Sequence, residues 1–130
     1  MAFYRTGGGG SATETVLWTN GSPTAQFAPQ DVTLSDDIDN YDFLKIEFIS
    51  TASTGVNGSV LVPVSDFKSM TNTASTTGFG FGLSSGVDTF ISRKTTYVND
   101  TKIHIGAATS YTGNTNNARA IPLQIIGLKF

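Results

Sequence analysis

Apolar and polar residues alternate with a period of two along much of the chain, which is typical of β-strands with one buried face. The clearest example is 43–49, where Leu44, Ile46 and Phe48 fall on one face and charged residues occupy part of the other. The segment 102–105 repeats this alternation between apolar and polar positions. The dominant period therefore predicts strands and not amphipathic helices.

Turn-forming residues divide the chain into short segments of the length that strands require. A helical turn competes only within 65–74, and no gap accommodates a long amphipathic helix. The turn signals stand at Asn20-Gly21-Ser22-Pro23, Asn57-Gly58, Ser84-Ser85-Gly86, Asn99-Asp100 and Thr112-Gly113-Asn114. Asn57-Gly58 in particular predicts a two-residue type I′ hairpin, because both residues tolerate positive φ.

These signals predict an all-β protein, an antiparallel β-sandwich of jelly-roll-like form with about eight short strands. Residues 14–130 are expected to form a single domain, and residues 1–13 a flexible Gly-rich N-terminal arm or linker. Such a linker is also found in engineered proteins, so its origin stays open. The expected strands are 14–19, 25–34, 43–49, 56–64, 79–84, 89–97, 102–105 and 122–130.

Composition narrows the function classes without selecting one. Charged residues make up only 14% of the chain, whereas Ser, Thr and Asn contribute 40 of 130 residues. The absence of cysteine excludes disulfides, thiolate zinc sites and a Cys nucleophile, and a single His offers little for a metal cluster. No apolar run is long enough for a membrane span, and no signal peptide is expected.

Charge is distributed unevenly along the chain. The formal net charge is −2, but residues 1–66 carry −6 and residues 67–130 carry +4. The interpretation we favour is electrostatic attraction within one domain, and the alternative is orientation of subunits in an oligomer. Arg93-Lys94 is the only basic pair. That is too little for the basic stripe of a nucleic-acid-binding protein, so no nucleic-acid partner is expected.

Two catalytic motifs occur, and neither has its required context. Residues 82–86 match G-x-S-x-G, and Asp88 or Asp100 with His104 would follow in hydrolase order. A nucleophile elbow needs a strand that turns into a helix, but the residues after 86 resemble another strand. Ser65 and Lys68 match S-x-x-K without the partner motifs of that class. We therefore expect no catalytic residues and no enzyme activity.

The densest acidic segment is 36–42, with Asp31 upstream. Its carboxylates could bind Ca²⁺, but the EF-hand layout is missing. The favoured interpretation is a turn in which Asp and Asn side chains cap their own backbone. His104, flanked by isoleucines, is expected to point outward and by itself forms no metal site. No metal or cofactor is therefore predicted.

Two further features concern aromatic side chains. Trp18 opens a strand and is expected in the core or at its rim rather than as a ligand platform. Residues 109–119 form the longest polar stretch that contains an aromatic residue, either a recognition loop or an ordinary solvated loop. Its candidate receptor-binding residues are Tyr111, Asn114, Asn116, Asn117 and Arg119.

Three stretches of the chain, 15–20, 27–46 and 121–129, carry a resemblance to a known group of proteins. In order and composition they resemble small all-β modules of tail-fibre, baseplate and related virion proteins of tailed phages and prophages. The resemblance extends from about Glu14 to the end of the sequence. It implies a homotrimeric fibre or knob whose loops contact a bacterial surface glycan or protein, with no catalytic residues.

The expected function is therefore that of a virion structural protein, assembled in the host cytoplasm together with other virion proteins. Many proteins of this type are much longer, which leaves a head-fibre or capsid decoration role open, with the arm as attachment. A non-catalytic carbohydrate-binding module is the other alternative. It usually shows several exposed aromatic residues and would need a signal peptide.

Overall fold

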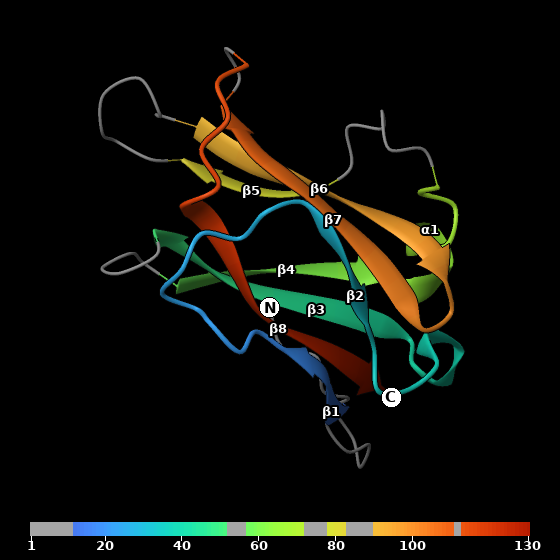
Figure 1. Cartoon of the computed structure of the whole chain (residues 1–130). Helices are drawn as coiled ribbons and strands as arrows, with labels where there is room; N and C mark the ends of the chain where they lie inside the picture. Colours follow the sequence, from blue (N-terminus) through green and yellow to red (C-terminus); the bar gives the residue numbers. More distant parts are fainter. Residues whose placement is uncertain (1–11, 52–56, 72–77, 83–89, 111–112) are drawn as a thin grey trace.

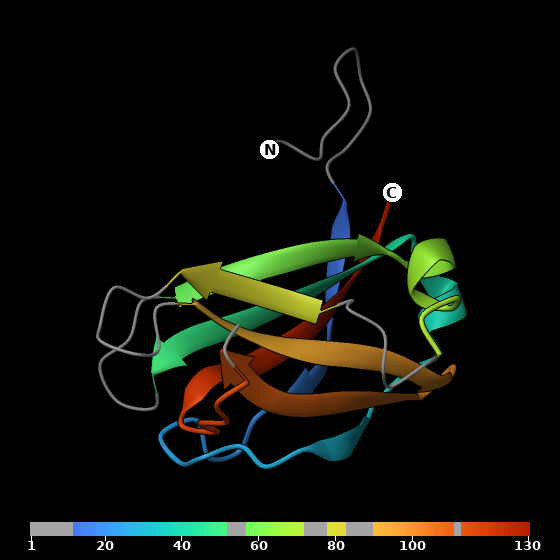
Figure 2. The ribbon, with the colours of Figure 1, turned by 90° about the horizontal axis from the view of Figure 1, so that it is seen from above.

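The computed structural model describes residues 12–51, 57–71, 78–82, 90–110 and 113–130. Within these residues the chain forms two four-stranded antiparallel sheets packed face to face, so the predicted β-sandwich is confirmed (Figures 1 and 2). The first sheet has the order β1-β8-β3-β4, from Thr13–Thr19, Arg119–Lys129, Phe43–Thr51 and Asn57–Pro63. The second has the order β2-β7-β6-β5, from Gln30–Thr33, Lys102–Ser110, Phe90–Asn99 and Gly78–Gly82.

The core lies between the two sheets and is built by the alternation seen in the sequence. Leu44, Ile46 and Phe48 of β3 are buried, and Ile103 and Ile105 of β7 are fully buried on the opposite layer. Burial of each such side chain stabilises the fold by about 1.5–3 kcal/mol. The hydrophobic pattern therefore fixes which face of β3 and β7 points inward.

Two short helical turns close one end of the sandwich. The turn η1 covers Ile38–Asn40, and α1 covers Val64–Phe67, which overlaps the segment 65–74 where a helical turn is predicted. Phe67 is fully buried and makes an edge-to-face contact with Tyr97, with ring centroids 6.2 Å apart. No helix in the described part of the chain is long and apolar enough to cross a membrane.

The hairpin predicted at Asn57-Gly58 is wrong. Both residues lie in β4, where Asn57 pairs with Ile49 and Gly58 with Phe48. Gly58 is needed for packing instead, because a Cβ there would lie 2.9 Å from Cζ of Phe48. Residues 52–56, between β3 and β4, lie outside the described residues.

Strand boundaries differ from the predicted ones at three places. The segment 25–34 holds only the short β2, whereas β7 continues to Ser110 and β8 begins at Arg119. The loop between β7 and β8 is therefore shorter than predicted. Its described part, residues 113–118, is called the tip loop below.

The jelly-roll part of the prediction is not confirmed. A jelly roll is a rolled-up double strand, which pairs the first strand with the eighth, the second with the seventh, the third with the sixth and the fourth with the fifth. The β1–β8 and β2–β7 pairs are present. However, β3 pairs with β4 and β8, and β6 pairs with β5 and β7.

The two ends of β8 mark the two ends of the molecule. At one end Lys129 pairs with Thr13, and η1, α1 and the β6–β7 turn lie nearby (Figure 1). At the other end Arg119 leads out of the tip loop. The two positions are about 33 Å apart along the strand at 3.3 Å per residue. The tip loop is thus far from the point where residues 1–12 join the domain.

Candidate functional site

Hydrogen bonds tie the start of the tip loop to Ser110, the last residue of β7. Gly113 has φ of +93°, a conformation that favours glycine, and its N–H donates to the Ser110 oxygen at 2.9 Å. The Asn114 N–H donates to Ser110 Oγ at 3.2 Å, and the Ser110 N–H donates to the Asn114 oxygen at 2.8 Å. These bonds fix the backbone of Asn114 while its side chain stays exposed. Tyr111 lies outside the described residues.

Asn116 and Asn117, both predicted contact residues, hold the loop itself. The Ala108 N–H donates to Asn117 Oδ1 at 3.1 Å, and the Asn116 N–H donates to the Ala108 oxygen at 2.9 Å. The Asn116 Oδ1 accepts from the Ala118 N–H at 3.1 Å. Both asparagines are half-buried. Their side-chain oxygens are therefore committed to the loop, which leaves Asn114 as the exposed amide.

Beneath the tip loop lies the fully buried side chain of Arg93, on β6. Its Nε donates to the Ala120 oxygen at 2.8 Å and its Nη1 to the Gly106 oxygen at 2.9 Å. Its Nη2 donates to the oxygens of Asn117 and Arg119 at 3.0 and 3.1 Å. One guanidinium therefore joins β6, β7, β8 and the tip loop.

The charge of Arg93 persists although it is buried. Desolvation lowers the pKa of the guanidinium to about 10, so the group remains protonated at neutral pH. The ring of Phe27 lies 5.4 Å from the guanidinium carbon and adds a cation–π contact. The Phe27 N–H donates to the Asn117 oxygen at 3.0 Å, which ties the 20–29 segment to the loop.

Ala120 and Arg119 follow the tip loop and belong to the same end of the domain. Ala120 has φ of +48°, an uncommon conformation for a residue with a Cβ, and its oxygen is the acceptor of Arg93 Nε. Arg119, the last predicted contact residue, is half-buried in β8 and pairs with Thr51. The structure thus brings Asn114, Asn116, Asn117 and Arg119 together within one short segment.

The sequence did not identify Arg93 as a residue of this site, because Arg93 and Lys94 together resemble a basic pair on a protein surface. The neighbouring residues Ser92, Lys94 and Thr95 are all polar, so the local sequence shows no alternation that would indicate an inward side chain. The register of β6 shifts between Arg93 and Thr95 and again between Tyr97 and Asn99. Such irregularities make the inward face difficult to follow from sequence alone.

At the opposite end, the acidic segment forms the predicted capping turn. The Asp37 N–H donates to Asp36 Oδ1, and the Asp39 N–H donates to Asp37 Oδ1, both at 2.8 Å. Tyr41 Oη donates to Asp36 Oδ2 at 2.8 Å, and this bond is the largest cause that lowers the pKa of Asp36. The local interpretation of these carboxylates is therefore confirmed.

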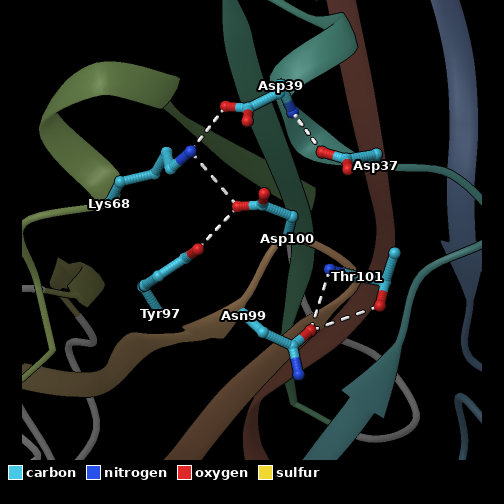
Figure 3. Close-up of polar contacts among 7 residues, drawn as sticks. All are labelled: Asp37, Asp39, Lys68, Tyr97, Asn99, Asp100 and Thr101. Carbon is cyan, nitrogen blue, oxygen red and sulfur yellow. Dashed lines mark hydrogen bonds and ion pairs between the residues drawn. The ribbon is translucent and has the colours of Figure 1, made fainter.

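The remaining carboxylates of this end surround a lysine (Figure 3). Lys68 Nζ lies 2.6 Å from Asp39 Oδ1 and 3.2 Å from Asp100 Oδ1, and Tyr97 Oη donates to Asp100 Oδ1 at 2.5 Å. These contacts raise the pKa of Lys68, chiefly through Asp39, and lower the pKa of Asp100, chiefly through Tyr97. The network links η1, α1 and the β6–β7 turn.

Three of these carboxylates could in principle hold a cation. One oxygen each from Asp37, Asp39 and Asp100 lies within 4.8 Å of the others. However, the ammonium of Lys68 already binds two of the three side chains. A positive charge of the chain itself already occupies this position, so the arrangement carries no argument for bound Ca²⁺.

Two residues of the catalytic motifs, His104 and Lys68, make polar contacts with Asp side chains in the described part of the chain. His104 points outward as predicted, and its Nδ1 lies 2.8 Å from Asp31 Oδ1 on the neighbouring β2, not near Asp100. Thr96, opposite His104 on β6, has a buried hydroxyl that makes no hydrogen bond within the described part of the chain. Ser84 and Asp88 lie outside the described residues. The described residues therefore show no connected nucleophile and base.

Other predictions for individual residues are also resolved. Trp18 is half-buried at the rim of the core, and its ring meets Phe27 edge-to-face at 5.9 Å.

Two ion pairs join the basic and acidic halves of the chain. They are Lys68 with Asp39, and Lys129 with Asp42 at 3.7 Å. These two ion pairs agree with attraction within one domain, and orientation of subunits stays a prediction.

No protein-family model matches the chain, and no curated protein matches it.

Proposed function

We propose that this chain is a non-catalytic virion module of tail-fibre or receptor-binding type, which contacts a bacterial surface glycan or protein through its tip loop. The observation that carries the proposal is the buried Arg93, which holds the tip loop in one conformation by donating to the oxygens of Asn117, Arg119 and Ala120. The virion context rests on the sequence resemblance of the three stretches.

A rigid loop suits weak, repeated binding to a surface ligand. Ordering a flexible loop costs free energy on binding, so a loop that is ordered beforehand retains more of its contact energy. Asn114 and Thr115 are exposed at its tip. An exposed amide can donate and accept hydrogen bonds to sugar hydroxyls, and Tyr111 could supply an apolar ring face.

The position of the tip loop in the domain also favours a role in binding. The tip loop and the junction with residues 1–12 lie at opposite ends of β8, so attachment at one end leaves the loop accessible at the other. We propose a homotrimer, because several linked weak sites gain avidity. Light scattering of the purified protein should then give a mass near three times 13.7 kDa.

A secreted carbohydrate-binding module is less well supported. Such modules usually present several exposed aromatic rings to sugars, whereas Phe130 is the only exposed aromatic among the side chains whose exposure the structure describes. A decoration role through residues 1–13 would not require the tip loop to bind anything.

The test compares the protein with a Tyr111→Ala/Asn114→Ala variant on a glycan array and in adsorption to a panel of bacterial strains. Asn40→Ala is the matched control, because Asn40 is an exposed asparagine at the opposite end. The double variant should melt within about 2 °C of the parent, since surface changes usually cost under about 0.5 kcal/mol. It should bind at least about tenfold more weakly, a loss of about 1.4 kcal/mol.

Equal binding by the folded double variant would refute a role for the tip loop. Binding by neither protein, together with incorporation into virions that depends on residues 1–13, would favour the decoration role. Binding to glycans of non-bacterial origin alone would favour the carbohydrate-binding module.

A further inference from the structure

Besides the core between the sheets, the sandwich has an apolar surface on the outer face of the β1-β8-β3-β4 sheet. Leu44 and Ile46 point into the core. Because side chains alternate along a strand, Phe43 before Leu44 and Lys45 after it point outward. Residues directly opposite one another in a sheet share a face. The strand register therefore places one apolar group on this outer face, called the outer patch: Val16, Phe43, Leu61, Ile126, Leu128 and Phe130.

The outer patch is separate from the core. None of its six residues belongs to the core cluster or to the residues packed against that cluster. Ile126 and Leu128 at its centre are only 6% and 4% exposed, whereas Val16 and Phe130 at its rim are 49% and 39% exposed. Phe130 meets Phe43 edge-to-face, with centroids 5.6 Å apart.

The position of the patch points to one occupant. Thr13 pairs with Lys129, so residues 1–12 join the domain beside Leu128 and Phe130. These residues begin Met1-Ala2-Phe3-Tyr4, an apolar segment, and continue through four glycines, Gly7–Gly10. An apolar segment and an apolar surface are thus connected by a tether that can reverse direction easily, because glycine adopts both signs of φ.

The tether is long enough to reach. The six residues 7–12 span up to about 20 Å when extended. Val16 is three residues beyond Thr13, about 10 Å along the strand. A segment that is tethered within reach has a millimolar effective concentration at its site, which favours the chain's own segment over that of a second copy.

We propose that Met1-Ala2-Phe3-Tyr4 folds back and covers the outer patch of its own chain, as a detachable strap on the β1-β8-β3-β4 sheet. The strap shields Val16 and Phe130 from water and stabilises the edge strand β1. This proposal is independent of the function of the tip loop, because the two surfaces lie on different parts of the molecule.

The test uses two substitution sites on the full chain, Phe3→Ser/Tyr4→Ser in the strap and Val16→Ser in the patch, alone and combined. Val98→Ser is the matched control, because Val98 is 45% exposed on the other sheet. Each strap or patch variant should lower the melting temperature by about 3–6 °C. The combined variant should lose less than the sum of the two, since contacting residues are not additive.

Trypsin gives a second measurement, because Arg5 lies between the apolar segment and the tether. Val16→Ser leaves the cleavage sequence intact and should raise the rate of cleavage after Arg5 by at least about threefold, as expected for local opening. Val98→Ser should leave that rate unchanged. The non-additivity of the strap and patch substitutions should be independent of protein concentration, because both sites belong to one chain.

Two results together would overturn the proposal. The losses of melting temperature would add in the combined variant, and Val16→Ser would leave the rate of cleavage after Arg5 unchanged. Dissociation of an oligomer in the strap variant, or coupling that disappears on dilution, would also overturn it by showing that the segment binds a second copy.

Discussion

Arg93 Nε donates to the Ala120 oxygen at 2.8 Å, and this hydrogen bond joins the two sheets at the end that carries the tip loop. Ala120 adopts an uncommon positive φ at this point. The fully buried guanidinium of Arg93 therefore donates to backbone oxygens of three segments. None of these four acceptors is a side chain. The tip loop takes its shape from the domain interior.

Arg93→Met should destabilise the protein by at least about 3 kcal/mol. Each buried oxygen left without a donor costs about 1–3 kcal/mol. Arg93 donates to four backbone oxygens, of which the Asn117 oxygen keeps the Phe27 N–H as a second donor. Arg93→Lys should restore little, because an ammonium lacks the planar fork of donors. Urea denaturation measures the change. Lys94→Met at the exposed neighbouring position is the control, and equal effects at both positions would refute the structural role of Arg93.

Asn117→Ala should loosen the tip loop, whereas Asn114→Ala should not. Asn117 Oδ1 accepts from the Ala108 N–H, so its removal leaves that N–H without its partner and costs about 1–2 kcal/mol. Hydrogen exchange at the Ala108 amide should become faster in Asn117→Ala alone. Equal exchange in the two variants would show that the side chain does not hold the loop.

Gly127→Ala should destabilise the fold by about 1–3 kcal/mol through overpacking. A Cβ at this position would lie 2.6 Å from Cγ and Cδ1 of Tyr41. Gly21→Ala is the matched control, since a Cβ at Gly21 would have nothing within 4 Å of it. Thermal melting compares the two, and a combined Gly127→Ala/Tyr41→Ala variant should lose less than the sum because the clash disappears.

Stability should fall in acid partly through Asp100. Hydrogen bonds from Tyr97 and Lys68 lower the pKa of Asp100 below 3.8, so the unfolded chain binds this proton more readily than the folded one. The stabilisation is therefore complete above pH 3.8 and is lost as pH falls through the lowered pKa. The difference in melting temperature between the protein and Asp100→Asn should shrink below pH 3.8, and a constant difference would contradict this assignment.

The local parts of the fold were predictable from sequence. Alternation identified the inward faces of β3 and β7, and the Asp36 and Asp37 caps follow from side chains that bond their own backbone. The Asn57-Gly58 prediction failed because the ring of Phe48 requires a glycine opposite it in the sheet. Tertiary packing there outweighs turn propensity.

The candidate site was predictable only in outline. Its segment and its asparagines are recognisable, but which side chains are exposed depends on long-range bonds to Ala108 and Arg93. These bonds join residues of two strands to the tip loop, and neither periodicity nor composition specifies such pairings. The register shifts of β6 further obscured that Arg93 points inward.

The location of the bound ligand tests the central claim most directly. Hydrogen exchange of the protein with and without a glycan or receptor fragment identified by the array should show new protection at Gly113, Asn114 and Asn116. The outer patch around Val16 and the acidic end around Asp39 should remain unchanged. Protection at either of those surfaces, with none in the tip loop, would contradict the account.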